Sequence, residues 1–197
     1  MVLPSNLIGN LTPNELSFLT ENEMITILPR YSMNKIDLIG TSIPKLRAMR
    51  REKVPLWVAL ILKSQSKCNI VPPDWLNHQY LKDKYDEEIR KANQFSALPF
   101  NWLEITKIFL DNASDDLQDS TDEIRSIIQD LKEIRLVKSR RGLKELNESN
   151  IQLNGLGMME INEIRTFVIP VMNKLRQLHD TTVKEEEAES DEDEMSE

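Results

Sequence analysis

Cysteine and histidine are scarce in this sequence. Its 197 residues include one cysteine, Cys68, and two histidines, His78 and His179, which lie far apart. A single thiol excludes an internal disulfide bond and fits a reducing compartment. The wide separation of the histidines leaves no local spacing for a zinc site, so we expect no metal. Cys68 has no histidine near it in the sequence, and we interpret it as a plain buried cysteine.

Glycine, aromatic residues and long apolar runs are also rare. Five glycines and 6% aromatic residues argue against an all-β sandwich and against a surface that stacks the bases of single-stranded nucleic acid. The apolar run Leu56–Leu62 is only about a third of the length that a membrane-spanning helix needs. The first ten residues lack the basic and apolar parts of a signal peptide. We therefore expect a soluble intracellular protein without a membrane partner.

The net charge of −8 is concentrated at one end of the chain. Residues 184–197 contain nine acidic residues and one lysine, which account for all of it. The other 183 residues carry 24 basic and 24 acidic groups, so the body is not the polycation that binds duplex DNA through its phosphates. The acidic segment is typical of a solvated, disordered tail, which we place at residues 181–197.

The N-terminal part predicts one helix and a small β unit. Thr12 can cap a helix whose first position is Pro13. Residues 24–28 and 35–40 alternate apolar and polar side chains, which is typical of strands. Two or three short strands are too few to be stable alone, so this unit must pack on something else. We place a small β-rich domain with an N-terminal helix at residues 1–52.

Residues 53–180 predict a helical domain. Ser120 and Glu123 match a capping box, in which two side chains satisfy free backbone N–H groups at the start of a helix. The polar residues 111–119 before it predict a solvated loop. The fold class is therefore mainly α, with a helical bundle domain preceded by a small β-rich N-terminal domain. Helices are expected at residues 56–63, 75–93 (capped by Asp74), 102–110, 120–141 and 158–179.

The last of these helices, with an expected break between Arg165 and Pro170, has more apolar surface than one neighbour in the chain can cover. At 100° per residue, its apolar side chains span an arc of about 140°. The helix is therefore either central in the chain's own bundle or shared with another chain. Apolar helix surface that the chain does not cover usually marks a protein interface, and the isolated chain would then be poorly soluble. We expect six residues to contact partner subunits. Two of them lie on the helix at 120–141 and four on the last helix, namely Leu136, Val137, Phe167, Val171, Met172 and Leu175.

The sequence predicts no catalytic, metal or cofactor site. It contains no nucleotide-binding loop, nucleophile elbow or zinc-protease motif. Gly155 and Gly157 form a lone G-x-G, which we interpret as a tight turn. The aspartates within residues 111–119 lack the spacing and the central glycine of a calcium loop.

Two basic clusters, at residues 47–53 and 132–144, leave open a second function as a DNA-contacting module. Their basic side chains can bind phosphates, although the acidic residues interspersed in the second cluster favour a solvated face. The possible DNA contacts are Arg140, Arg141 and Lys144. A salt titration on DNA separates the two functions, because reversing these charges flattens the salt dependence only if they bind phosphates.

Four blocks of sequence occur in an order typical of one protein family. They are MITILPRYSMNKIDLIG (24–40), VPLWVALILKSQSKCNIVPPDWL (54–76), DNASDD (111–116) with DEIRSIIQDLKEIR (122–135), and LNGLGMMEINEIR (153–165). The second block is the most specific. With all four in register over residues 11–179, the chain resembles the second Psf type among the subunits of the GINS complex.

This resemblance implies a non-catalytic scaffold subunit without a cofactor. GINS is a heterotetramer of related subunits, so the implied partners are three other GINS subunits. The resemblance further implies that the complex joins the MCM ring and a RecJ-like partner to form the active replicative DNA helicase, in the initiation and elongation of DNA replication. It implies a location in the nucleus and contact with DNA at most indirectly.

Overall fold

The structure is a computed structural model that describes residues 9–39, 41–143 and 153–194, with side chains up to residue 182. Its mainly α architecture, with a β-rich part first, confirms the predicted fold class. The N-terminal part contains, in chain order, α1 (Pro13–Thr20), β1 (Met24–Pro29), β2 (Ile36–Leu38), β3 (Thr41–Ile43), β4 (Glu52–Pro55), α2 (Leu56–Ser64) and β5 (Cys68–Ile70). The helical part contains α3 (His78–Arg90), α4 (Trp102–Asn112), the 3₁₀ turn η2 (Ser114–Asp116), α5 (Thr121–Gly142) and α6 (Met158–Glu194).

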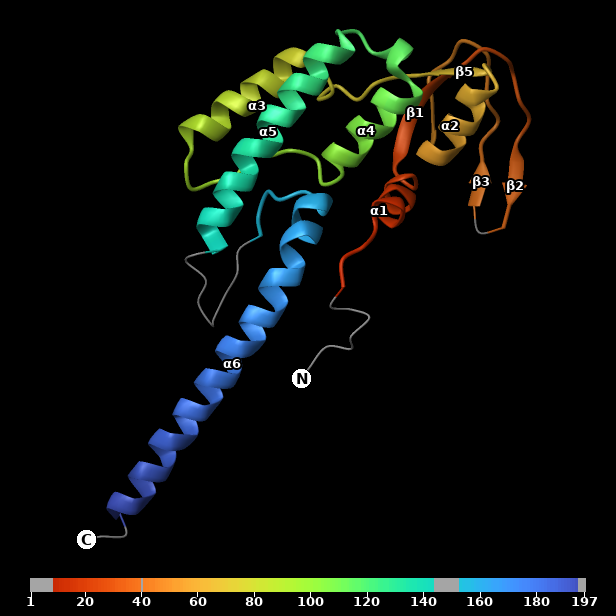
Figure 1. Cartoon of the computed structure of the whole chain (residues 1–197). Helices are drawn as coiled ribbons and strands as arrows, with labels where there is room; N and C mark the ends of the chain where they lie inside the picture. The colour runs from red at the N-terminus through yellow and green to blue at the C-terminus, as the bar shows by residue number, and fades with distance from the viewer. Residues whose placement is uncertain (1–8, 40, 144–152, 195–197) are drawn as a thin grey trace.

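Strands β4, β1 and β5 form an antiparallel sheet with β1 in the centre, and β2 pairs with β3 in a separate hairpin (Figure 1). The boundary expected between residues 52 and 53 thus falls inside β4, and both α2 and β5 belong to the β-rich part. Charged side chains and a proline concealed β4 in the sequence, because it is an edge strand that tolerates both.

Side chains that accept backbone N–H groups cap the starts of α1 and α3. At α1 the Thr12 hydroxyl accepts from Glu15 N while the Glu15 carboxylate accepts from Thr12 N, a complete capping box. Helix α3 begins at His78, later than predicted, because Asn77 is its cap and accepts from Tyr80 N at 2.8 Å. Ser120 precedes α5 as predicted, but its exposed side chain makes no capping hydrogen bond.

One continuous apolar core joins the two parts of the chain. It includes residues from the sheet, such as Ile27 and Cys68, and residues from the helices, such as Trp102 and Leu131. Helix α2 packs on β1 and β5, while α3 lies along α5 on the other side of α4 (Figure 1). This shared core gives the small β unit the support that its few strands require.

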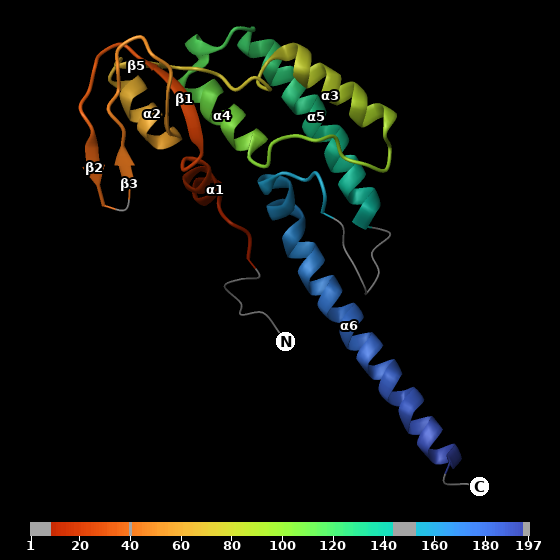
Figure 2. The same ribbon diagram turned by 180° about the vertical axis from the view of Figure 1, so that it is seen from behind.

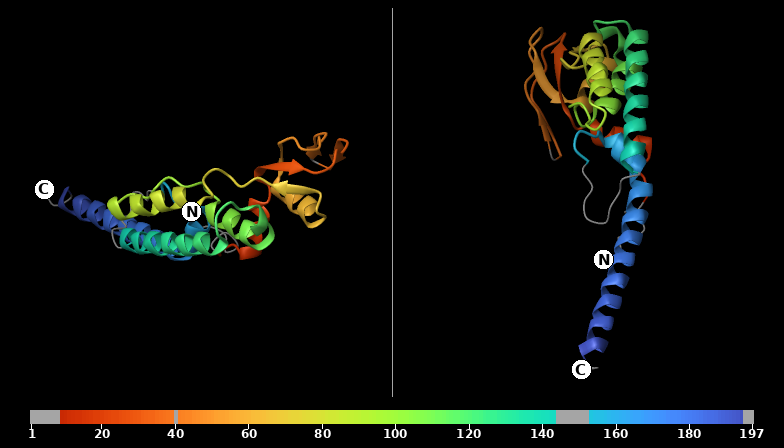
Figure 3. Two further views of the ribbon diagram at one scale, coloured as in Figure 1. Left: turned by 90° about the horizontal axis from the view of Figure 1, so that it is seen from above. Right: turned by 90° about the vertical axis from the view of Figure 1, so that its left-hand side faces the viewer.

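Helix α6 extends away from the rest of the molecule, as views from three further directions also show (Figures 2 and 3). It continues through Pro170, where we expected a break, and its backbone is helical to Glu194, where we expected a disordered tail. Proline leaves the carbonyl of residue 166 without its helical partner, but Thr166 and Pro170 are both exposed, so water can bond to it. Glutamate, abundant after residue 184, is a good helix former.

Candidate protein–protein interface

The projecting part of α6 carries an apolar stripe that faces solvent. Phe167 is 52% exposed, and Leu178 near the end of the stripe is also exposed. Val171, Met172 and Leu175 between them are partly exposed. Since this part of α6 extends away from the body (Figure 2), the stripe is free to pack against another protein.

The six residues predicted for partner contact fall into two sets on separate helices. Four of them, Phe167, Val171, Met172 and Leu175, are on the projecting part of α6. Leu136 and Val137 are on α5, where Val137 is 58% exposed and Leu136 is partly exposed. The helical periodicity used for the prediction found residues that share a face, but it carries no information about which faces of different helices adjoin.

Other exposed apolar residues were missed by this reasoning. Phe18 and Leu19 on α1, Met24 on β1 and Phe100 before α4 all have exposed side chains. These residues occur singly or in pairs, so no long apolar stripe marks them in the sequence. Their exposure is a property of the tertiary fold.

A buried arginine fixes the start of α6 against the body. Arg135 on α5 is fully buried, and its guanidinium donates five hydrogen bonds, which uses all five of its N–H groups. Nε and Nη2 bind the Glu160 carboxylate of α6 at 2.7 and 2.9 Å, and Nη1 binds Glu88 of α3 at 2.5 Å. The remaining two hydrogen bonds reach the carbonyls of Ser96 and Gly155. Four separate segments therefore meet at one side chain.

Aromatic rings and a second cation complete this Arg135 cluster. The guanidinium carbon lies 4.9 Å from the centre of the Phe95 ring and 5.8 Å from that of Trp102, which are cation–π distances. Lys138, one turn further along α5, binds Glu88 and also donates to the carbonyls of Lys91 and Gln94. The cluster thus ties α5 both to the end of α3 and to the segment that follows it.

The charges in the cluster stabilise one another in spite of their burial. Burial alone would raise the pKa of Glu88, but hydrogen bonds from Lys138 and Ser96 and the charge of Arg135 hold that pKa below its usual value. Burial likewise would lower the pKa of Arg135, yet Glu160 and Glu88 raise it. Glu88 and Arg135 are therefore both ionised at neutral pH, and their charges are a fixed part of the cluster.

The G-x-G motif forms the turn that leads into α6, as predicted. Gly155 has a φ of +83°, a conformation that side chains with a Cβ rarely adopt. A Cβ on Gly157 would lie 2.9 Å from Trp102 Nε1, so only glycine fits there without a shift. The Gly157 N–H donates to Glu160 at 2.6 Å. This turn and the Arg135 cluster together determine the direction in which α6 leaves the body.

The acidic loop before α5 is an internal clamp, which corrects the prediction that it is solvated. The Asp116 carboxylate is almost fully buried, and it accepts from Ile70 N at 2.7 Å and pairs with Lys63 at 2.8 Å. Asp115 pairs with the same lysine at 2.7 Å, and this hydrogen bond lowers the pKa of Asp115. The clamp connects α2 and β5 to the helical part. Ile70 lies 46 residues before Asp116 and Lys63 lies 52 residues before Asp115, beyond the reach of local pattern.

Few cations of the predicted DNA-contact cluster are free to meet a phosphate. Arg135 and Lys138 are engaged in the buried cluster, and Lys132 pairs with Glu163 at 3.3 Å. Arg140 and Arg141 are exposed on the last turn of α5. Lys144 lies outside the residues that the structure describes. The other cluster, at residues 47–53, keeps its arginines on the surface.

The described residues contain no group of three or more side chains that could hold a metal ion. Cys68 is fully buried, and burial raises the pKa of its thiol to about 11, so the thiolate that reacts or binds metals is not formed. Over residues 9–39, 41–143 and 153–194, no helix is both long enough and apolar enough to cross a membrane.

Two family models match consecutive parts of the chain. A model described as the PSF2 N-terminal domain matches residues 12–71, and one described as the GINS complex protein helical bundle domain matches residues 75–179. The junction between the two matches follows β5, where the last strand of the sheet ends.

Curated relatives match over almost the whole chain. A Candida albicans protein named DNA replication complex GINS protein PSF2 is 74% identical over 182 residues, which cover 92% of this chain and 90% of that protein. A protein of the same name from Saccharomyces cerevisiae is 42% identical, with 91% and 92% covered. One from Schizosaccharomyces pombe is 40% identical, with 90% and 96% covered.

Proposed function

The chain belongs to the PSF2 family of GINS complex subunits, and on this premise we propose that it is a non-catalytic scaffold within a GINS heterotetramer. It is a subunit and not an enzyme. In this proposal it holds three sister subunits together in the nucleus. The complex then joins the MCM ring and a RecJ-like partner to form the active replicative DNA helicase, in initiation and elongation.

The uncovered stripe on α6 is the observation that carries this proposal. Phe167, Val171 and Leu175 follow one another along one face of α6, where Phe167 is exposed and the other two are partly exposed. This helix extends away from the body of the chain (Figure 2). Placing such a row of apolar side chains in water is unfavourable by about 25 cal/mol for each Å² exposed, and a neighbouring subunit removes this penalty. The stripe thus favours permanent association over a transient encounter.

The rigid attachment of α6 supports the same function. A scaffold must present its binding face at a fixed angle, and a helix on a loose joint would lose conformational entropy on binding. Arg135 and Gly157 fix the first turn of α6 to α5 and α4. Asn162 in the second turn exchanges two hydrogen bonds with the backbone of Leu11. The stripe begins immediately after these contacts.

Co-expression with the three other GINS subunits, followed by size-exclusion chromatography, tests the proposal. The wild-type chain is expected to elute with all three subunits. The double variant Val171→Asp, Leu175→Asp is expected to elute apart from them, because it places two charges in the centre of the stripe. Gln177→Asp is the matched control, since it adds a charge on the opposite face of the same helix.

Circular dichroism of each variant shows whether the body still folds. Because the substituted positions lie on the projecting part of α6, the body is expected to remain folded. Co-elution of the double variant at the wild-type level would contradict the role of the stripe. A wild-type chain that does not assemble with the three subunits would contradict the proposed function itself.

The second candidate function, direct DNA contact, depends on the exposed Arg140 and Arg141. The variant Arg140→Glu, Arg141→Glu tests it in the assembled complex on a DNA duplex. For a scaffold, the slope of log affinity against log salt concentration stays unchanged. If the two arginines bind phosphates, each substitution lowers the slope by about 1.

A further inference from the structure

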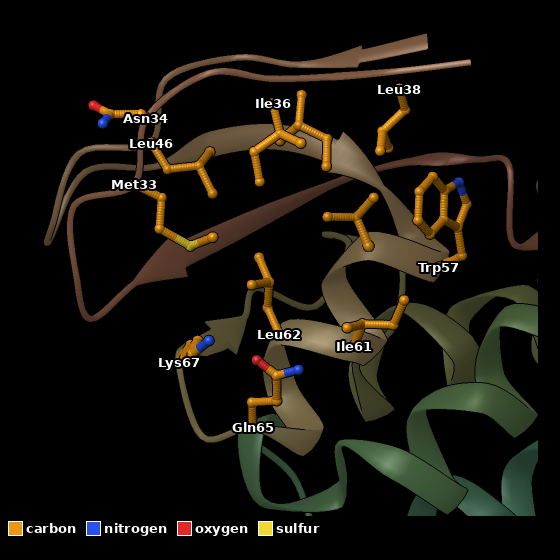
Figure 4. A pocket seen from close by; sticks show the side chains of 12 residues that line it. Met33, Asn34, Ile36, Leu38, Leu46, Trp57, Ile61, Leu62, Gln65 and Lys67 are labelled. Atoms are coloured by element: carbon orange, nitrogen blue, oxygen red, sulfur yellow. The ribbon is translucent and has the colours of Figure 1, made fainter. Parts of the chain in front are cut away.

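The β-rich part has an apolar groove that the proposed function does not use. The groove lies between the β2–β3 hairpin and α2 and has a volume of about 240 Å³ (Figure 4). In Figure 4, side chains from the hairpin and from α2 point toward one another across it. Leu38 of the hairpin is 42% exposed and Ile61 of α2 is 49% exposed. Since a cavity of about 150 Å³ holds a benzene ring, this groove has room for one or two large apolar side chains.

The framework of the groove is fixed while its mouth is open. Ile43 and Leu46 are buried, and Met33 and Leu46 exchange two backbone hydrogen bonds that hold the base of the hairpin. Val58 and Leu62 form the buried side of α2. The groove is therefore a preformed feature, as ligand sites usually are.

The segment of the chain that forms the groove is basic in composition. Residues 24–71 contain nine basic and two acidic residues, a net charge of +7 in a chain whose overall charge is −8. Lys67 is among the residues that line the groove, and Lys45 and Arg47, both exposed, flank Leu46 in the sequence. A ligand of complementary charge must therefore be acidic.

The geometry points to a docking site for an acidic segment of a partner protein, with large apolar side chains that enter the groove. Apolar lining side chains such as Met33, Ile36 and Ile61 offer nothing to phosphates, which favours a polypeptide over DNA. The acidic residues 184–197 of this chain are not the expected occupant, because α6 carries residues 184–194 away from the body and the acidic segment has a single large apolar side chain, Met195. This inference does not depend on the proposed interface on α6.

A phage-displayed library of random 16-residue peptides, selected on the assembled complex, tests the inference. The variants Ile61→Glu and Leu38→Asp place acidic groups in the groove. Ile89→Glu is the matched control, because Ile89 is 54% exposed on α3, away from the groove. Selected peptides are expected to contain acidic residues around one or two large apolar ones. Both groove variants are expected to bind them at least about tenfold more weakly, and the control as well as the wild type.

Added salt is expected to weaken the binding of the peptides to the wild type, because salt screens the attraction between their acidic residues and the basic residues near the groove. Four results overturn the inference: no peptide distinguishes the wild type from the groove variants; the selected peptides lack acidic residues; a 20-base-pair duplex displaces the peptides; or neither groove variant assembles with the other subunits. The last result means that a sister subunit fills the groove. It differs from failure of the wild-type chain to assemble, which would contradict the proposed function instead.

Discussion

Replacement of Arg135 by methionine is expected to lower the free energy of unfolding by about 3–5 kcal/mol, the usual effect of removing one partner from a buried ion pair. Methionine has a similar length and packs between the rings of Phe95 and Trp102, so the change removes charge more than volume. It leaves the buried Glu160 with the Gly157 N–H as its remaining hydrogen-bond donor among those described here. Glu88 keeps Lys138 and Ser96, which places most of the expected loss on the Arg135–Glu160 contact.

Urea unfolding followed by tryptophan fluorescence measures this loss, since Trp102 lies in the cluster. With an m-value of about 3 kcal/mol/M, the midpoint is expected to fall by about 1–2 M. Arg140→Met is the matched control, because Arg140 is exposed on the same helix. This control is expected to stay within about 0.5 kcal/mol of the wild type. Where the isolated chain aggregates, hydrogen exchange of α3 and α5 amides in the assembled complex gives the same ranking.

The pH dependence separates charge from packing. In the wild type the pKa of Glu88 lies below its usual 4.5, so its contribution is complete above pH 4.5 and is lost as the pH falls through the lowered value. In Arg135→Met, Glu88 loses the charge of Arg135, which is one of the causes that lower its pKa, so the variant is most destabilised near pH 7. The difference between the two proteins should therefore shrink as the pH falls toward 4.

A second substitution in the cluster provides a further check. The double variant Arg135→Met, Glu160→Gln removes the carboxylate that lost its partner and keeps the Glu88–Lys138 pair, so it is expected to be more stable than Arg135→Met alone. The reasoning would be refuted by a loss below about 1 kcal/mol for Arg135→Met, by an equal loss for Arg140→Met, or by a difference that does not change with pH.

Three further predictions concern the joints around the cluster. Asp116→Ala leaves the Ile70 N–H and Lys63 without their buried acceptor, so the free energy of unfolding in urea is expected to fall by about 2–4 kcal/mol. The control Asp111→Ala, at an exposed position, is expected to lower it by less than about 0.5 kcal/mol. Similar losses for both variants would contradict the clamp. Gly157→Ala forces the start of α6 away from Trp102, and a change in the distance between spin labels on α6 and α5 is expected, whereas the open position Gly142→Ala should leave it unaltered. Burial raises the pKa of Glu104, so the charged form destabilises the fold at neutral pH. Glu104→Gln is therefore expected to raise the melting temperature at pH 7.5, and this gain should disappear as the pH falls toward 4.5. A gain that does not change with pH would argue against a charge effect.

Local pattern in the sequence was sufficient for most of the helices. The spacing of Ile124, Ile127 and Leu131 is that of one helix face, and all three are buried. Arg135 lies eleven residues after Ile124, which places it near the centre of that same apolar face. A charged residue in an apolar stripe is a signal for a buried ion pair, and we read it instead as part of a basic surface. Its partners could not be predicted, because Glu88 and Glu160 are 47 and 25 residues away.

Because contacts distant in the sequence cannot be predicted from local pattern, the exposure of the apolar residues on α2 and α6 could not be predicted either. Helix α2 is apolar on every face, which is typical of a buried helix. Ile61 is nevertheless exposed, because the hairpin that faces it stands away from it. Helix α6 has a narrower stripe, and it leaves the body altogether. Periodicity shows how much apolar surface a helix carries, whereas the tertiary fold decides how much of it the chain itself covers. The apolar surface that stays uncovered on α2 and on α6 therefore provides two separate binding sites for partners. The two sites can be tested separately, with charges placed at Ile61 and at Val171.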